Sequence, residues 1–387
     1  MTEYSKRFGS LDTNVVHAGS PKPHIEGAVV SPIFQSANYL MADESAYDEV
    51  RYIRLSNSPS HLTLQARLAV IEAGEAALVT ASGMAAISSS LLAHLGAGDH
   101  LLTQRTLYGG SQSFLDQDGP RLGLTYTAVD AADSASWEAA LLPETKVFYV
   151  ESISNPLMEV GDLTAVVEFC KRHELVSIID NTFATPVNFR PLEVGFDLVV
   201  HSATKYLNGH SDIVAGAVVG SSARVAAVRE VLLHLGGSAD PHSCFLFERG
   251  LKTLVLRLQR QNASALRLAQ LLAGRSEVRR VNYPGLEDDP SHRFASGLFR
   301  GFGGMFSFYA RDRDLARSFL DNIRIPIHAA SLGGPESLVV RPSRSSHLGQ
   351  SEEERQALGI GDDLIRVSVG IEDIDELMAD FTLALEA

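Results

Sequence analysis

Two short stretches carry side chains suited to chemistry, and each includes a β-branched run. Ile178-Ile179-Asp180 ends on a carboxylate, and Val199-Val200-His201-Ser202 leads to the amine of Lys205. Such runs are typical of buried strands in a parallel sheet. Open α/β sheets bind ligands at the carboxyl ends of their strands. The sequence therefore predicts that Asp180 and Lys205 flank one small ring.

A carboxylate and an amine in this arrangement suit pyridoxal phosphate (PLP). The aldehyde of PLP reacts with a lysine amine, and a fixed carboxylate keeps its pyridine nitrogen protonated. The hydroxyls of Ser202 and Thr204, on the turn before Lys205, could receive phosphate oxygens. The structural alternative is that Asp180 caps a helix and Lys205 is a surface residue. Either residue alone favours that alternative, whereas the combination favours a cofactor site.

A second group of phosphate ligands is suggested where Thr80-Ala81-Ser82 passes from a predicted strand into a predicted helix. Ser82 can cap this helix, which leaves the N–H groups of Gly83 and Met84 at the positive end of the helix dipole. Phosphate binds readily to such a helix start. An ordinary capped helix is the alternative, and this stretch alone favours it.

Tyr108, in Leu107-Tyr108-Gly109-Gly110, follows the next predicted strand. Its phenol could lie flat against a cofactor ring and could exchange a proton. A tyrosine packed in the core is an equal alternative.

Two arginines could bind anions. Arg366 stands in an apolar predicted strand, and a buried arginine pairs either with a substrate carboxylate or, more commonly, with an internal one. Tyr52 and Arg54 flank Ile53 on an alternating stretch and could contact a phosphate together, although such a pair is more often solvated.

Composition excludes several classes of protein. The 387-residue chain has a formal net charge of −14 without charge blocks, which argues against a nucleic-acid or anionic-membrane partner. The dispersed histidines and the well-separated Cys170 and Cys244 predict no metal site and no disulfide scaffold. No Gly-x-Ser-x-Gly motif marks a serine hydrolase. Without an apolar N-terminal run or a bilayer-length stretch, a soluble cytoplasmic protein is expected.

The order of predicted elements indicates an α/β fold with a mostly parallel sheet covered on both faces. A helix is expected from Gly83 and another over Leu163–His173, between strands at Ala76–Thr80, His100–Thr103, Thr125–Val129, Lys146–Val150, Val176–Asp180, Leu198–His201 and Ile213–Val219.

The remaining segments predict an N-terminal arm and a smaller C-terminal unit. We expect an arm over residues 1–45, a large domain over 46–235 and a small α/β domain over 236–387. The small domain should contain one helix running through Leu251 to Ala265, strands near Gly304–Tyr309 and Leu364–Val369, and a closing amphipathic helix.

Together these motifs resemble the cystathionine synthase and lyase family of PLP-dependent enzymes. The resemblance covers nearly the whole chain. It is carried by Tyr52-Ile53-Arg54, Ser82-Gly83-Met84, Leu107-Tyr108-Gly109, Asp180-Asn181-Thr182, Ser202-Ala203-Thr204-Lys205, Ser331-Leu332-Gly333 and Arg366-Val367-Ser368-Val369-Gly370. It implies the fold type I architecture of PLP-dependent transferases and a homotetramer built from dimers with shared active sites.

The resemblance also implies residue roles. Lys205 would hold the cofactor and later move protons, Asp180 would pair with the ring nitrogen, and Tyr108 would stack on the ring and protonate the departing sulfur. The phosphate would be bound by Gly83, Met84, Ser202 and Thr204, and by Tyr52 and Arg54 of the neighbouring subunit. The substrate α-carboxylate would be bound by Asn155, Ser331 and Arg366.

The implied activity is carbon–sulfur cleavage of cystathionine or a related amino acid, which gives a 2-oxo acid and ammonia. Two positions depart from the family pattern: Gly110 replaces the cysteine of methionine γ-lyases, and Ala330 replaces the glutamate usual in cystathionine γ-synthases and γ-lyases. Arg341 and Arg344 would favour a substrate with a second anionic group. A γ-replacement transferase of the cystathionine γ-synthase or O-acylhomoserine sulfhydrylase type is the first alternative. A non-catalytic cofactor-binding descendant is the second.

Overall fold

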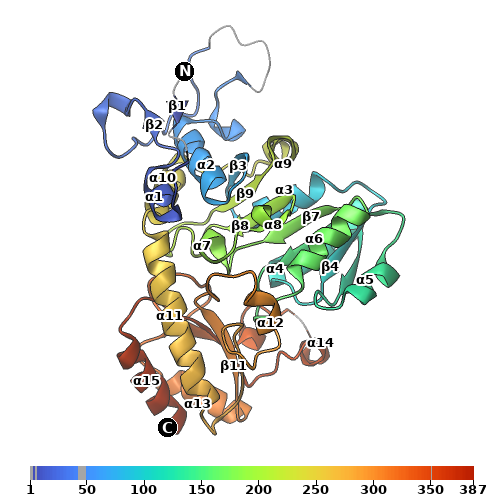
Figure 1. Cartoon of the computed structure of the whole chain (residues 1–387), viewed down its shortest axis with the longest axis vertical. Helices are drawn as coiled ribbons and strands as arrows, with labels where there is room; N and C mark the ends of the chain where they lie inside the picture. The colour runs from blue at the N-terminus through green and yellow to red at the C-terminus, as the bar shows by residue number, and fades with distance from the viewer. Residues whose placement is uncertain (1–2, 5–6, 42–48, 350) are drawn as a thin grey trace.

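The computed structural model describes residues 3–4, 7–41, 49–349 and 351–387, and its largest element is a seven-stranded sheet (Figure 1). The strands are β3 (Ala76–Thr80), β4 (His100–Gln104), β5 (Thr125–Val129), β6 (Thr145–Glu151), β7 (Val176–Asp180), β8 (Leu198–Ser202) and β9 (Gly216–Gly220). Their spatial order is β3-β9-β8-β7-β6-β4-β5. β9 alone runs in the direction opposite to the other six strands of this sheet. The mostly parallel sheet predicted from the sequence is confirmed.

One predicted strand begins later than expected. The β-branched run suggested a strand over residues 213–219, whereas β9 begins at Gly216. The backbone N–H of Ala215 donates to the Thr204 hydroxyl and its carbonyl accepts from the Thr204 backbone N–H, so this segment pairs with the loop after β8 instead.

Helices cover both faces of this sheet because alternate strand residues point to opposite sides. Leu78 and Val200 pack with α3 (Gly83–Leu92) and α9 (Ser222–Leu235). Val79 and Val199 pack in a second core with α2 (Pro59–Ile71) and α6 (Leu163–Arg172). The shorter helices of this region are α4 (Gly109–Ser113), α5 (Ser134–Ala140), α7 (Thr185–Asn188) and α8 (Pro191–Val194). The result is a three-layer α/β/α arrangement.

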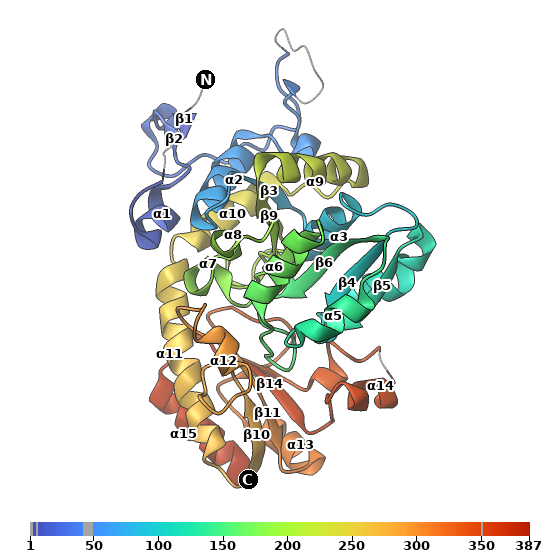
Figure 2. The same cartoon turned by 45° about the vertical axis from the view of Figure 1, so that its right-hand side comes forward.

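A second, smaller sheet lies in the C-terminal part (Figure 2). Its strands are β10 (Val278–Asn282), β11 (Met305–Ala310), β12 (Ile327–His328), β13 (Leu338–Val340) and β14 (Leu364–Ser368), in the order β10-β11-β14-β13-β12. The accompanying helices are α10 (Pro241–Leu251), α11 (Leu254–Ala273), α12 (His292–Ala295), α13 (Arg313–Asn322), α14 (Glu352–Ala357) and α15 (Ile374–Glu386). Phe308, Phe319 and Phe381 join β11, α13 and α15 in one core.

The helix expected to run from Leu251 to Ala265 is two helices. The i−4 bonding pattern breaks at Lys252 and Thr253, whose N–H groups bond to carbonyls three residues back. One of these carbonyls, that of Gly250, also accepts from the Arg257 guanidinium, 2.9 Å away. Apolar spacing alone could not reveal this break, because Leu251, Leu254 and Leu258 keep helical spacing across it and pack in one core.

The N-terminal arm has little regular structure in its described residues. It contains β1 (Glu3–Tyr4), α1 (Leu11–His17) and β2 (Pro21–Lys22). Two apolar side chains further along are largely exposed, Val29 at 89% and Leu40 at 99%. In Figures 1 and 2 the arm extends away from the large sheet. The proposed domain boundaries at residues 45 and 235 stay predictions, and the first falls within residues 42–48, outside the described part. No helix in the described part is long and apolar enough to cross a bilayer.

Candidate active site

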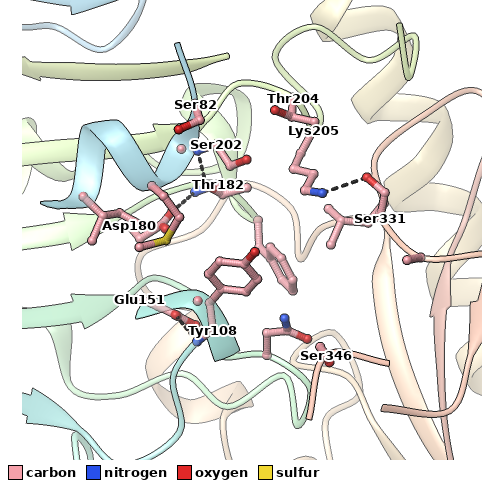
Figure 3. Close-up of a pocket in the computed structure, with 18 of the residues that line it drawn as sticks. Ser82, Tyr108, Glu151, Asp180, Thr182, Ser202, Thr204, Lys205, Ser331 and Ser346 are labelled. Carbon is pink, nitrogen blue, oxygen red and sulfur yellow. Dashed lines mark hydrogen bonds between the residues drawn. The ribbon is translucent and has the colours of Figure 1, made fainter. Parts of the chain in front are cut away.

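A cavity of about 600 Å³ opens at the carboxyl ends of β6, β7 and β8, where loops of the C-terminal part meet the large sheet (Figure 3). Ten of its lining residues come from the predicted site: Gly83, Met84, Tyr108, Asn155, Asp180, Ser202, Thr204, Lys205, Ser331 and Arg366. Segments from both sheets therefore build one site.

Lys205 lies on the turn that follows β8 and points across the cavity (Figure 3). Its Nζ donates a hydrogen bond to the Ser331 hydroxyl over 2.7 Å. Burial, with a smaller contribution from the Arg366 charge, lowers the pKa of the Lys205 amine to about 8. More of this amine is therefore neutral, and nucleophilic, near neutral pH than in an ordinary lysine.

Asp180 is the last residue of β7 and its side chain is buried. Its Oδ1 accepts from the backbone N–H of Thr182 at 2.9 Å. Burial raises the pKa of Asp180, while the hydrogen bonds from Thr182 oppose the rise. The Thr182 hydroxyl in turn accepts from the Ser202 backbone N–H at 2.8 Å, which ties the ends of β7 and β8 together. Asp180 is thus a fixed carboxyl aimed into the cavity.

The start of α3 lies against the end of β8. The Ser82 hydroxyl accepts from the Ala85 N–H at 3.0 Å, as predicted for a helix cap. A Cβ atom at Gly83 would lie only 2.8 Å from the Ser202 Cβ, so a glycine is needed for this approach. The Thr204 hydroxyl bonds to both the N–H and the carbonyl of Ala215. This corner is a compact, hydroxyl-rich cup at a helix N-terminus.

Tyr108 precedes α4, and its ring stands over the cavity (Figure 3). The residue as a whole is 42% exposed. Its backbone N–H donates to the Glu151 carboxyl at 2.6 Å. A Cβ at Gly110 would lie 2.5 Å from the Tyr108 Cε1 and 3.0 Å from the Met84 Sδ. The ring therefore occupies space that a larger residue at position 110 would need. The alternative that Tyr108 is packed in the core is therefore wrong, because its ring is exposed to the cavity.

Arg366 enters from β14, and the described residues include no carboxylate in an ion pair with it. Its Nη1 donates to the Asn155 Oδ1 at 3.0 Å and its Nη2 to the Ser331 carbonyl at 3.1 Å. Burial lowers the pKa of Arg366 to about 10, which still leaves it cationic at neutral pH. A buried cation beside a cavity is suited to an anionic ligand.

Tyr52 and Arg54 do not line this cavity. Ile53–Leu55 forms a 3₁₀ turn, so the alternating extended stretch expected from the sequence is wrong at this point. The Arg54 Nη1 donates to the Leu233 carbonyl at 3.1 Å, and the guanidinium carbon lies 5.9 Å from the Tyr52 ring centroid. The pair lies together on the surface.

Sequence reasoning missed several lining residues. Glu151 directly follows a predicted strand, and Asp180 ends another. A carboxylate at a strand end, the signal that identified Asp180, was therefore also present at Glu151. Thr182 was noted only as part of a motif. Ser345 and Ser346 also line the cavity, and no local pattern distinguishes them from other loop serines.

Comparisons with known proteins agree over the full length. The chain matches the family model of the Cys/Met metabolism PLP-dependent enzymes over residues 12–386. Cystathionine beta-lyase of Coxiella burnetii is 40% identical over 389 residues, which cover 100% of both chains. L-methionine gamma-lyase of Pseudomonas putida is 41% identical over 397 residues, which cover 99% of each chain.

A solved structure supports the same relationship. The crystal structure of cystathionine gamma synthase from Xanthomonas oryzae pv. oryzae, in complex with aminoacrylate and cysteine, has 36% sequence identity to this chain. It superposes with a TM-score of 0.94 over 98% of both chains. This likeness supports the fold type I architecture predicted from the sequence, and the chain belongs to the family of Cys/Met metabolism PLP-dependent enzymes.

Proposed function

We propose that this chain is a PLP-dependent carbon–sulfur lyase that eliminates a thiol from cystathionine or a related sulfur amino acid and yields a 2-oxo acid and ammonia. One observation carries the proposal: a single cavity contains a partly buried amine, a fixed carboxyl, an aromatic ring and a buried arginine. Relatives of similar sequence include a cystathionine beta-lyase and an L-methionine gamma-lyase.

The residues present fit PLP. Lys205 would hold its aldehyde carbon, Asp180 its ring nitrogen, and Tyr108 the face of its ring. The phosphate would lie at the start of α3, against the N–H groups of Gly83 and Met84 and the hydroxyls of Ser202 and Thr204. The close approach of Gly83 to Ser202 supports this assignment, because a side chain at position 83 would close the cup. When bound, PLP supplies an electron sink for the substrate α-carbon.

The substrate α-carboxylate would be bound by Arg366, with Asn155 and Ser331 beside it. Asn155 and the Ser331 carbonyl hold the two terminal nitrogens of the guanidinium in fixed directions. Such an arrangement favours bidentate contact with a carboxylate over a single-point contact. It would orient the substrate so that its α-hydrogen faces Lys205.

Two side chains would move protons. The Lys205 Nζ, with a pKa of about 8, would take the proton from the substrate α-carbon. The Tyr108 hydroxyl would give a proton to the departing sulfur. Both groups line the same cavity, which supports the assignment of Lys205 as the base and Tyr108 as the acid.

The active enzyme would be a homotetramer with shared sites. Tyr52 and Arg54 lie outside the cavity of their own chain, which fits a role at the phosphate of a neighbouring subunit. The exposed apolar residues of the arm, Val29 and Leu40, suit burial against another copy. Cys170 and Cys244 are free thiols, which is compatible with the proposed cytoplasmic location.

The test is a substrate panel with the purified protein and PLP. Cystathionine, methionine, homocysteine, cysteine and O-acylhomoserines would be incubated separately, with keto acids and thiols identified in each product mixture. Release of pyruvate or 2-oxobutyrate without an added thiol supports the lyase. Product formed only when a thiol is added would replace it with a γ-replacement transferase, and no turnover of any member would contradict both.

A further inference from the structure

Glu151 is a buried carboxyl that the proposed reaction does not use. It ends β6, one strand away from Asp180 on β7, and the two residues are register partners. Only 5% of Glu151 is exposed, and that part lines the cavity. A buried carboxyl without hydrogen bonds is costly, so its partners should indicate its purpose.

The Glu151 carboxyl connects two separate loops. It accepts the backbone N–H of Tyr108, from the loop after β4, at 2.6 Å (Figure 3). It also accepts a backbone hydrogen bond from Asn155, in the loop after β6. These loops carry the ring-stacking tyrosine and the amide that holds Arg366. One side chain thus fixes the backbone of both.

The hydrogen bonds continue from Glu151 to the reactive amine. The Asn155 Oδ1 accepts from Arg366, Arg366 donates to the Ser331 carbonyl, and the Ser331 hydroxyl accepts from the Lys205 Nζ. Glu151 is itself anchored, since its backbone N–H donates to the Gln104 Oε1 at 2.8 Å. A shift of its carboxyl would therefore displace groups on two sides of the cavity.

We infer that Glu151 is a positioning residue that fixes the Tyr108 ring and the Asn155–Arg366 carboxylate clamp together, through hydrogen-bond acceptance at the Tyr108 and Asn155 amides. The inference rests on the proposed function, because it concerns how PLP and the substrate carboxylate are held. This positioning role needs a side chain long enough to place a hydrogen-bond acceptor at both amides. It does not need a negative charge. Burial and the nearby Asp180 carboxylate raise the pKa of Glu151 well above its ordinary value, which agrees with a role independent of charge.

Three substitutions separate length from charge. Glu151→Gln keeps an oxygen acceptor at the same distance without a carboxylate. Glu151→Asp keeps the carboxylate and shortens the side chain, and Glu151→Ala removes the acceptor. Glu168→Ala is the control, because Glu168 is an exposed carboxyl on α6 that does not line the cavity.

Two readouts report the two loops in the holoenzyme. The visible circular dichroism of bound PLP and the Kd of PLP for the apoprotein report the Tyr108 side. On the Asn155 side, the readout is binding of L-alanine relative to ethylamine, which lacks only the carboxylate, measured from the cofactor absorption. Loss of two neutral hydrogen bonds predicts a weakening of at least about fivefold in both PLP affinity and the L-alanine preference.

The inference predicts that Glu151→Ala and Glu151→Asp lose both properties, that Glu151→Gln recovers most of both, and that Glu168→Ala behaves as the wild type. If Glu151→Ala does not fold, the Gln and Asp variants decide the question by themselves. The inference is overturned if the Asp variant matches the wild type, or if the Gln variant is as defective as the Asp variant. A wild-type protein that binds no PLP would overturn the proposed function as well.

Discussion

The Nζ of Lys205 lies 2.7 Å from the Oγ of Ser331, although the two residues are 126 positions apart in the chain. Lys205 follows a strand of the large sheet, and Ser331 belongs to a loop of the C-terminal part. This contact joins the two regions at the reactive amine. The C-terminal part therefore completes the site as well as covering it.

Ser331→Gly should weaken catalysis without weakening the fold. Ser331 has a φ of 82°, in the left-handed region where glycine is unstrained, so this change removes the hydroxyl without adding backbone strain. Loss of one hydrogen bond worth about 0.5–1.5 kcal/mol predicts a fall in kcat/KM of about 2- to 10-fold. The melting temperature should not fall. An unchanged kcat/KM would show that the contact with Lys205 has no role in the reaction.

The reaction of the apoprotein with PLP should accelerate as pH rises through about 8, the pKa of Lys205. Only the neutral amine is nucleophilic, so a lowered pKa moves the onset of reaction down from the ordinary value near 10.5. Arg366→Gln removes a nearby positive charge and should move the midpoint to higher pH. Stopped-flow absorbance would measure both profiles. A wild-type midpoint near 10.5, or no shift in the variant, would contradict this electrostatic explanation.

Asp180→Asn should reduce PLP affinity by about 10- to 100-fold, the usual consequence of losing a hydrogen bond to a charged group. The asparagine keeps the size of the side chain and cannot provide the negative charge. Asp162→Asn is the control, since Asp162 caps α6 outside the cavity and asparagine also caps helices. Titration of each apoprotein with PLP gives the Kd. Equal affinities in the two variants would remove Asp180 from the proposed cofactor site.

Gly110→Ala should displace the Tyr108 ring and lower kcat/KM by at least about tenfold, because even a 1 Å misplacement near the chemistry is costly. The added Cβ would lie 2.5 Å from the ring carbon Cε1. Gly297→Ala is the control, because a Cβ there has no atom within 4 Å. Visible circular dichroism would follow the ring and cofactor together. Retained activity and an unchanged spectrum would show that the ring can move aside without consequence.

Much of the large sheet could be predicted because most of its strands are buried and appear as short apolar runs. Strands β3, β5 and β7 have the predicted bounds. The positions of Asp180 and Lys205 in one cavity followed from the rule that strand ends meet at one edge of a sheet. This part of the site could be predicted from local sequence because neighbouring strands of one sheet set the positions of both residues.

Long-range contacts were less accessible. Nothing near Ser345 or Ser346 indicates that this loop reaches the cavity, and the Arg257 guanidinium that contacts the Gly250 carbonyl at the break between α10 and α11 comes from the following helix. Glu151 was overlooked because its role depends on loops from two strands and not on its own segment. These features are set by tertiary packing, which spacing within one segment does not encode.

The most direct test of the central claim is reduction of the PLP-loaded protein with borohydride, followed by peptide mass spectrometry. The account predicts a yellow protein that loses its visible absorption on reduction and carries a stable pyridoxyl group on Lys205. Lys205→Ala should carry no such label. A colourless protein, or a pyridoxyl group attached elsewhere with Lys205 unmodified, would contradict the account.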